Sequence, residues 1–163
     1  MPQSILVTPG ESLPACDPRL ASLYHYWLGI RPAADLLPGR RHLEPEAIPQ
    51  LLPWICLTDV QRAPLRFKYR LVGTRLVDVL GSDPSGGWYE EVHPDFPVSN
   101  AYPHFVAAVE QRRVAWYRGP ATMFASARWK TIERLILPMA QNGRDVDMLL
   151  AITALDPAGG RDR

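Results

Sequence analysis

The sequence predicts an α+β fold: a five-stranded antiparallel sheet with helices over one face and an additional N-terminal helix. Five segments show the apolar alternation or the apolar runs of β-strands. Helical spacing of apolar residues separates the second strand from the third. An Asn-Gly pair at 142–143, a strong hairpin signal, joins the last two strands, so we expect these neighbours to pair antiparallel.

Length and composition indicate one globular domain. The chain has 163 residues, of which 47% are hydrophobic and 21% charged. Eighteen Lys and Arg residues against seventeen Asp and Glu residues leave a net charge of +1, so we expect neither a nucleic-acid nor a membrane partner. No apolar run approaches the about 18 residues of a membrane span, and the N-terminus lacks a secretory signal pattern. The sequence therefore predicts a cytoplasmic protein.

The N-terminal part begins with a polar, proline-containing segment, residues 1–16, which we expect to be flexible. A helix is predicted over 17–30, because Asp17 can cap it, Pro18 suits its first turn and Gly29 can end it.

This helix carries one apolar stripe with the i, i+3, i+4, i+7 and i+8 spacing of a buried face. The stripe consists of Leu20, Leu23, Tyr24, Trp27 and Leu28. It either contacts a second copy of the chain or covers the outer face of its own sheet. We favour a homodimer interface, because the two aromatic side chains supply a large contact area.

The first two strands are expected at residues 54–60 and 66–72. In the second of them Phe67, Tyr69 and Leu71 alternate with basic residues and are expected to face inward. The spacing becomes helical after Gly73, so the chain leaves the sheet there and begins the helical cover.

A longer helix and three strands follow. The helix is expected over 99–111, and the strands at residues 113–119, 130–139 and 145–153. The domain is therefore assigned to residues 31–155, and we expect the tail, 156–163, to be disordered.

Four stretches of this sequence are similar to the PAS domain, and more narrowly to short stand-alone bacterial PAS proteins. They are YWL in the first helix, IPQLLPWICLTDV, FKYRLVGTRLVDVLGSDPSGGWYEE and ERLILPMAQNGRDVDMLLAI, which together span most of residues 24–154. The resemblance implies a PAS-like sheet with its helices and a non-catalytic sensor or adaptor in bacterial signalling. Such a protein acts through a small-molecule ligand in the pocket between sheet and helices, through contacts with a signalling protein, or through both.

Five residues are candidates for contact with a ligand in that pocket: Tyr69, His104, Trp116, Arg134 and Met148. Trp116 and Tyr117 lie on opposite faces of one strand, so one of them faces the pocket, where it either packs or forms an aromatic wall. Arg134 lies mid-strand. If it faces inward it needs a carboxylate or an anionic ligand, and if it faces outward it is solvated.

Two alternative functions remain open. His104 precedes the third strand on the element that supplies the haem ligand in oxygen-sensing PAS proteins, so the resemblance allows a haem-binding sensor. His93, Asp95 and His104 could instead support acid–base chemistry in a small α+β enzyme. No nucleophile, metal-ligand spacing or phosphate-loop pattern accompanies them, so we expect no cofactor, no metal and no catalysis.

Overall fold

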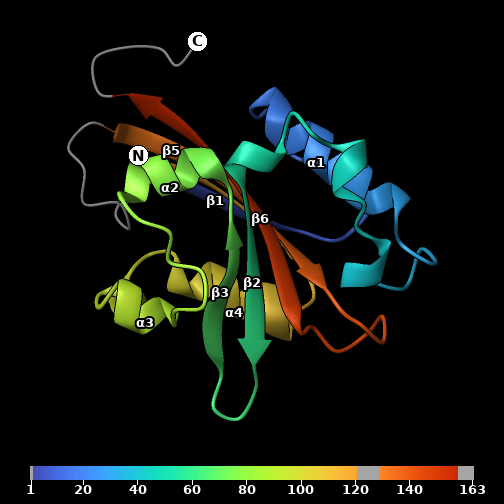
Figure 1. Ribbon diagram of the computed structural model, residues 1–163. Helices are drawn as coiled ribbons and strands as arrows, with labels where there is room; N and C mark the ends of the chain where they lie inside the picture. The colour runs from blue at the N-terminus through green and yellow to red at the C-terminus, as the bar shows by residue number, and fades with distance from the viewer. Residues whose placement is uncertain (1, 121–128, 158–163) are drawn as a thin grey trace.

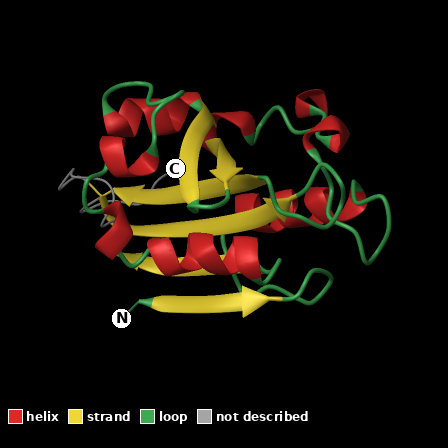
Figure 2. Ribbon diagram, turned by 90° about the horizontal axis from the view of Figure 1, so that it is seen from below, coloured by secondary structure: helices red, strands yellow, loops and turns green. Residues whose placement is uncertain are grey.

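The computed structural model describes residues 2–120 and 129–157, with the backbone alone at 129, 130, 156 and 157. Within these described residues the chain forms one antiparallel sheet of six strands, in the spatial order β1-β4-β5-β6-β2-β3. Helices lie on both sides of the sheet (Figures 1 and 2). The predicted α+β class and antiparallel sheet are confirmed, with one strand more than the five predicted.

The strands are β1 (Gln3–Val7), β2 (Ile55–Gln61), β3 (Arg66–Val72), β4 (Val114–Pro120), β5 (Trp129–Met139) and β6 (Met148–Pro157). The α-helices are α1 (Pro18–Gly29), α2 (Thr74–Leu80), α3 (Tyr89–Val92) and α4 (Tyr102–Glu110). Single turns of 3-10 helix occur at η1 (Arg40–His42), η2 (Pro45–Ala47), η3 (Leu52–Trp54) and η4 (Phe96–Val98). Among these described residues no helix combines the length and the apolar character needed to cross a membrane.

The extra strand corrects the prediction of a flexible lead-in over residues 1–16. Residues 3–7 form β1, which pairs antiparallel with β4 at one edge of the sheet. Its last residue, Val7, is buried, whereas Ile5 is exposed. Residues 3–7 show no clear alternation of polar and apolar residues, so the local sequence does not identify this strand. Its pairing depends on the free edge of β4, more than a hundred residues away.

Helix α1 begins and ends as its sequence predicts. The Asp17 side chain accepts a hydrogen bond from the backbone N–H of Arg19 at 2.9 Å, and Pro18 occupies the first turn. The indole Nε1–H of Trp27 donates to the carbonyl oxygen of Pro138 in β5 at 3.1 Å, which fixes the helix to the sheet.

The apolar stripe of α1 is buried in its own chain. Leu20, Leu23 and Trp27 are 0% exposed, Tyr24 is 3% exposed, and Leu28 packs against the same core. These side chains cannot supply the homodimer contact that the sequence predicted, so that assignment is wrong. The alternative is what the structure shows: α1 covers the sheet face opposite to α2, α3 and α4.

Strand β3 changes face near its end. Thr58 in β2 pairs with Tyr69, but the next residue back, Leu57, pairs with Leu71, so β3 contains one extra residue and a β-bulge. Phe67 and Tyr69 therefore face the helices as predicted, whereas Leu71 points to the other side and is 48% exposed. The expected inward orientation of Leu71 is wrong because one inserted residue reverses the side-chain direction.

Helix α2 starts at a close contact between two segments. A Cβ atom on Gly73 would lie 2.4 Å from the carbonyl oxygen of Leu52, so only glycine allows β3 to turn into α2 beside η3.

An aromatic cluster joins the sheet to the other helices: the Phe67 ring makes edge contacts with Phe96 at 6.0 Å and Phe105 at 5.2 Å. This cluster fixes α4 against β3.

The C-terminal tail was expected to be disordered over residues 156–163. Strand β6 continues to Pro157, so the first two tail residues belong to the sheet. The remainder of the predicted tail, from 158, lies outside the described residues.

Candidate ligand cavity between the sheet and the helices

A small cavity of about 40 Å³ lies between the sheet and the helices α2, α3 and α4. Strands β2, β3, β5 and β6 form its floor, and the three helices form its roof. The lining residues are Cys56, Tyr69, Val72, Leu76, Leu80, Tyr89, Phe105, Arg134, Ala151 and Thr153. The cavity is therefore mostly apolar, with a few polar side chains that converge on it.

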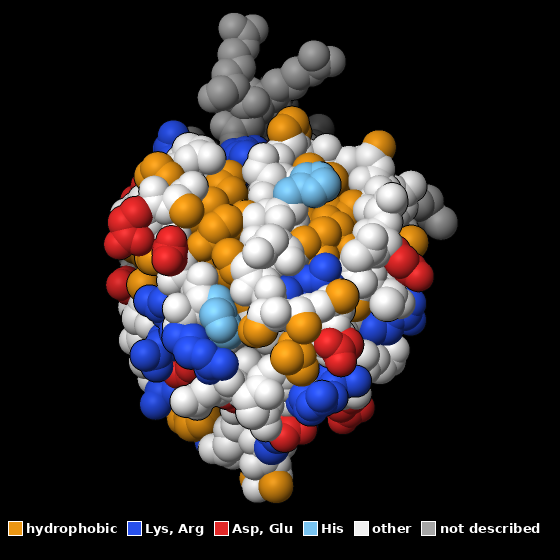
Figure 3. Space-filling model, turned by 90° about the vertical axis from the view of Figure 1, so that its right-hand side faces the viewer, with side chains coloured by type: hydrophobic (Ala, Val, Ile, Leu, Met, Phe, Trp, Pro, Cys, Tyr) orange, Lys and Arg blue, Asp and Glu red, His pale blue; other side chains and the backbone are white. Residues whose placement is uncertain are grey.

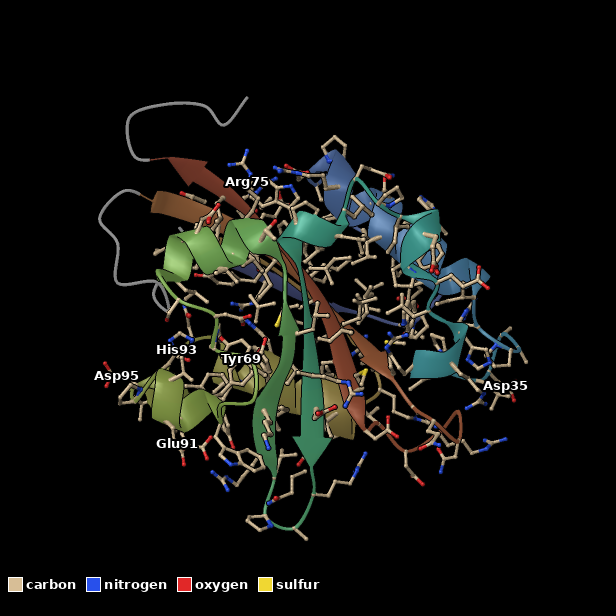
Figure 4. All side chains as sticks on the ribbon, viewed as in Figure 1. Asp35, Tyr69, Arg75, Glu91, His93 and Asp95 are labelled. Carbon is tan, nitrogen blue, oxygen red and sulfur yellow. The ribbon has the colours of Figure 1, made fainter. Side chains whose placement is uncertain are left out.

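Two stacked tyrosines form one wall of this cavity. The rings of Tyr69 and Tyr89 stack with their centroids 3.9 Å apart. The Tyr69 hydroxyl lies 2.7 Å from Nε2 of His93 (Figure 4), and the Tyr89 hydroxyl lies 2.7 Å from Oγ1 of Thr58. Burial raises the pKa of both tyrosines and raises the pKa of the Cys56 thiol to about 11. These three lining groups are therefore uncharged at neutral pH.

Arg134 supplies the only charge on the cavity lining among the described residues. Its side chain is buried, with 6% exposed, and burial lowers its pKa to about 10, so the guanidinium stays protonated at neutral pH. Its Nη2 lies 3.4 Å from Nδ1 of His104, and its guanidinium lies 5.1 Å from the ring centroid of Tyr117. Its Nε has no hydrogen-bond partner in the described part of the chain.

The preceding residue, Glu133, provides the opposite case on the other face of the sheet. Its carboxylate is 8% exposed and accepts hydrogen bonds from Trp116 Nε1 at 2.8 Å, Arg118 Nη2 at 3.1 Å and the backbone N–H of Asp17 at 3.1 Å. Every one of these contacts lies on the α1 side. One buried charge of β5 is thus well satisfied, and its neighbour is not.

A comparison with protein families decides what this arrangement is. A family model described as a PAS domain matches residues 16–154, which is most of the chain. The chain belongs to the PAS domain family. No curated protein and no solved structure matches it. PAS domains are sensory and signalling modules, generally without catalysis.

The five residues predicted to contact a ligand fall into three groups according to their position relative to this cavity. Tyr69 and Arg134 line it, and Arg134 takes the inward orientation that the sequence left open. His104 stands behind Arg134 as a neutral acceptor, because burial first and the Arg134 charge second lower its pKa to about 4. Trp116 and Met148 are elsewhere. Trp116 faces α1, and Met148 lies near Arg40 and Asp59 at the far end of the sheet.

The sequence analysis missed the lining residues Tyr89 and Thr153, and it missed Thr58, whose hydroxyl is the hydrogen-bond partner of Tyr89. Thr58 and Thr153 are hydroxyl residues inside apolar strands, and each is buried. A polar residue on the inward face of an apolar strand is a signal that could have identified them. Tyr89 gave no such signal, because its position depends on the loop that precedes α3.

The groups considered for acid–base catalysis are not brought together in this PAS domain. His93 bonds to Tyr69, whereas Asp95 is exposed and points away from the protein (Figure 4). His104 contacts Arg134 instead of either group. Among the described residues no cluster of three or more His, Cys, Asp or Glu side chains could hold a metal ion.

Haem does not fit the cavity as it is shaped. Ligand pockets of cofactor size have volumes of about 300–1,000 Å³, whereas this cavity has about 40 Å³. His104 faces the charged Arg134 through its Nδ1, and it is not among the lining residues. The residues present therefore do not form a haem site.

A second hollow lies on the α1 side of the sheet, outside the PAS cavity. It is an apolar groove of about 450 Å³ between the 3-10 turns and strands β2 and β3, and Leu43, Ile48 and Leu71 are among its lining residues. Figure 3 shows apolar side chains between charged ones on the side of the molecule that carries α1. The groove offers few polar atoms that could orient a small molecule, so we take the cavity between the sheet and helices α2, α3 and α4 as the candidate site.

Proposed function

We propose that this protein is a non-catalytic PAS sensor that responds to a small ligand bound between the sheet and the helices. The observation that carries the proposal is the cavity lining, in which buried polar groups of Tyr69, Tyr89, Thr153 and Arg134 converge within an apolar shell. Such a shell excludes water, and its few polar groups select a ligand by hydrogen bonding.

The chemistry of the lining supports sensing over catalysis. The Cys56 thiol is protonated at neutral pH, because burial raises its pKa to about 11. Tyr69 is hydrogen-bonded to His93, and among the described residues no serine hydroxyl or thiol is hydrogen-bonded to that histidine as a nucleophile would be. A bound ligand would therefore be held without being transformed.

We further propose that the protein acts in the cytoplasm through contacts with a signalling protein, as an adaptor whose affinity depends on the ligand. The homodimer predicted from the sequence stays a prediction, and it needs a surface other than the buried stripe of α1. The net charge of +1 gives no support to a nucleic-acid partner.

A cavity-filling variant tests this function. Ala151 lines the cavity, and Ala151→Leu adds side-chain volume where a ligand would sit. Ala154 is also buried in β6, but its neighbour in β5 is Glu133, on the α1 side, so Ala154→Leu is the matched control. We expect small compounds of a few heavy atoms that raise the melting temperature of the wild type to lose this effect in Ala151→Leu and to keep it in Ala154→Leu. If every such compound acts equally on both variants, the cavity is not the ligand site.

A further inference from the structure

We propose that the cavity binds a small planar oxyanion, such as formate, acetate, nitrate or bicarbonate, through the guanidinium of Arg134. The inference rests on the proposed function, because it names the class of ligand for the same cavity. It is carried by a buried, positively charged side chain that lines the cavity and has an unpaired N–H.

The first step in the argument is the missing counter-charge. In the described part of the chain no carboxylate lies within ion-pair distance of Arg134. The nearest acidic residue in sequence, Glu133, is directed to the other face and is occupied by Trp116 and Arg118. A buried charge without a partner costs free energy, because the protein interior replaces its hydration poorly.

The second step is that the existing neighbours of Arg134 satisfy it only in part. His104 is a neutral acceptor at 3.4 Å, near the limit for a hydrogen bond. The rings of Tyr117 and Phe105 offer their faces at 5.1 and 5.9 Å. These contacts leave Nε–H free, and Nε–H together with an Nη–H forms the parallel pair of donors that a carboxylate accepts.

The third step is the electrostatics of the remaining lining. Tyr69, Tyr89 and Cys56 are neutral, and the other described lining residues except Arg134 carry no charge. No resident anion therefore competes with a ligand for the guanidinium. The hydroxyl of Thr153 is a further donor on the same lining.

The fourth step is size. A water molecule needs roughly 10–15 Å³ of such space, so a cavity of about 40 Å³ holds an anion of a few heavy atoms. Formate, nitrate, bicarbonate and acetate are in this range. Larger anions such as citrate or a nucleotide are too large for the cavity in this shape.

The experiment measures melting temperature with sodium formate, acetate, nitrate and bicarbonate, and with the neutral isosteres formamide and acetamide. Sodium chloride at equal ionic strength controls for general salt effects. At an anion concentration about ten times Kd, we expect at least one oxyanion to raise the melting temperature of the wild type by about 3–6 °C. The amides should give no shift.

Variants assign the response to the guanidinium. Arg134→Gln removes the charge and should lose the oxyanion response, while Arg70→Gln, at an exposed arginine of β3, should keep it. Because Arg134 has no carboxylate partner among the described residues, we expect Arg134→Gln to remain folded by circular dichroism and to be no less stable than the anion-free wild type. In wild-type protein the Arg134 Nε–H resonance should shift on titration with the binding oxyanion, which gives a readout without any variant.

Each outcome decides between the two proposals. An oxyanion shift of equal size in wild type and Arg134→Gln, an equal response to chloride, or no response to any oxyanion would overturn the oxyanion assignment. Binding of the neutral amides that Ala151→Leu abolishes would also overturn it, while leaving the sensor function intact. If Ala151→Leu changes the melting-temperature shift caused by none of the oxyanions and none of the amides, the proposed function fails as well.

Discussion

At the scale of single residues, the Glu133 carboxylate is a buried acceptor on the α1 face of the sheet. It accepts hydrogen bonds from the Trp116 indole, the Arg118 guanidinium and the backbone N–H of Asp17, the residue that caps α1. It therefore joins β4, β5 and the start of α1 at one point.

We expect Glu133→Ala to lower the free energy of unfolding by about 2–4 kcal/mol, because it leaves these donors without an acceptor. Glu133→Gln keeps an acceptor oxygen and should lose less. The measurement is urea denaturation, with the exposed Glu110→Ala as control. Similar midpoints for Glu133→Ala and Glu110→Ala would mean that water replaces these contacts.

His104 makes the stability of the protein depend on pH. Burial, and then the charge of Arg134, lower the pKa of His104 to about 4, compared with about 6.5 in an unfolded chain. Between these values the unfolded chain binds a proton that the folded protein does not, so stability falls as pH falls through this window. The loss should be smaller than about 1.4 kcal/mol per pH unit, because His104 is partly exposed and solvent screens it.

Denaturation midpoints measured between about pH 4 and pH 6.5 should therefore change less steeply in His104→Gln than in the wild type. His25→Gln, at an exposed histidine of α1, controls for the substitution itself. An identical slope in wild type and His104→Gln would show that other groups cause the acid sensitivity.

At the scale of elements, the bulge in β3 gives Phe67 and Leu71 opposite orientations, although the alternation in the sequence predicts that both face inward. Phe67 is 1% exposed and packs on four aromatic rings. Phe67→Ala should therefore cost about 3–5 kcal/mol. Leu71→Ala should cost less than about 1 kcal/mol, since this side chain is half exposed. Thermal melts of the two variants measure the difference, and equal losses would contradict the bulge.

The elements also show how much of the fold the sequence could predict. Helix α1 and strand β3 start where predicted because their signals are local: the Asp17 cap, Pro18 and the alternation from Arg66. Strand β1 and the face that α1 covers were not predictable in this way, because both depend on contacts with β4, β5 and β6 far along the chain. The same limit applies to the cavity. The charge of Arg134 was visible in the sequence, but its inward orientation required the register of β5 against its neighbours.

At the scale of the whole molecule, α1 is part of the single core. It covers Leu135, Leu137 and Ile152, which are fully or almost fully buried on its side of the sheet. A chain that begins at residue 32 exposes this face, so we expect it to unfold or aggregate.

A substitution on α1 tests the same point in the intact chain. Trp27→Glu places a charge in the core and should abolish folding, while His25→Glu, on the exposed side of the helix, should not. Circular dichroism with sedimentation measures both folding and association. A folded monomeric Trp27→Glu variant beside a dimeric wild type would restore the homodimer contact that we reject.

The consecutive placement of Glu133 and Arg134 has a mechanical consequence. One peptide group joins Arg134, which lines the cavity under α2, α3 and α4, to Glu133. The Glu133 carboxylate accepts a hydrogen bond from the Asp17 N–H on the opposite face of the sheet. A strand transmits a rotation or a shift along its own backbone, so a pull on Arg134 acts on Glu133 with no intermediate element. We therefore expect ligand binding to change the hydrogen-exchange rate of the Asp17 N–H. Strand β5 then couples the cavity on one face of the sheet to the start of α1 on the other face.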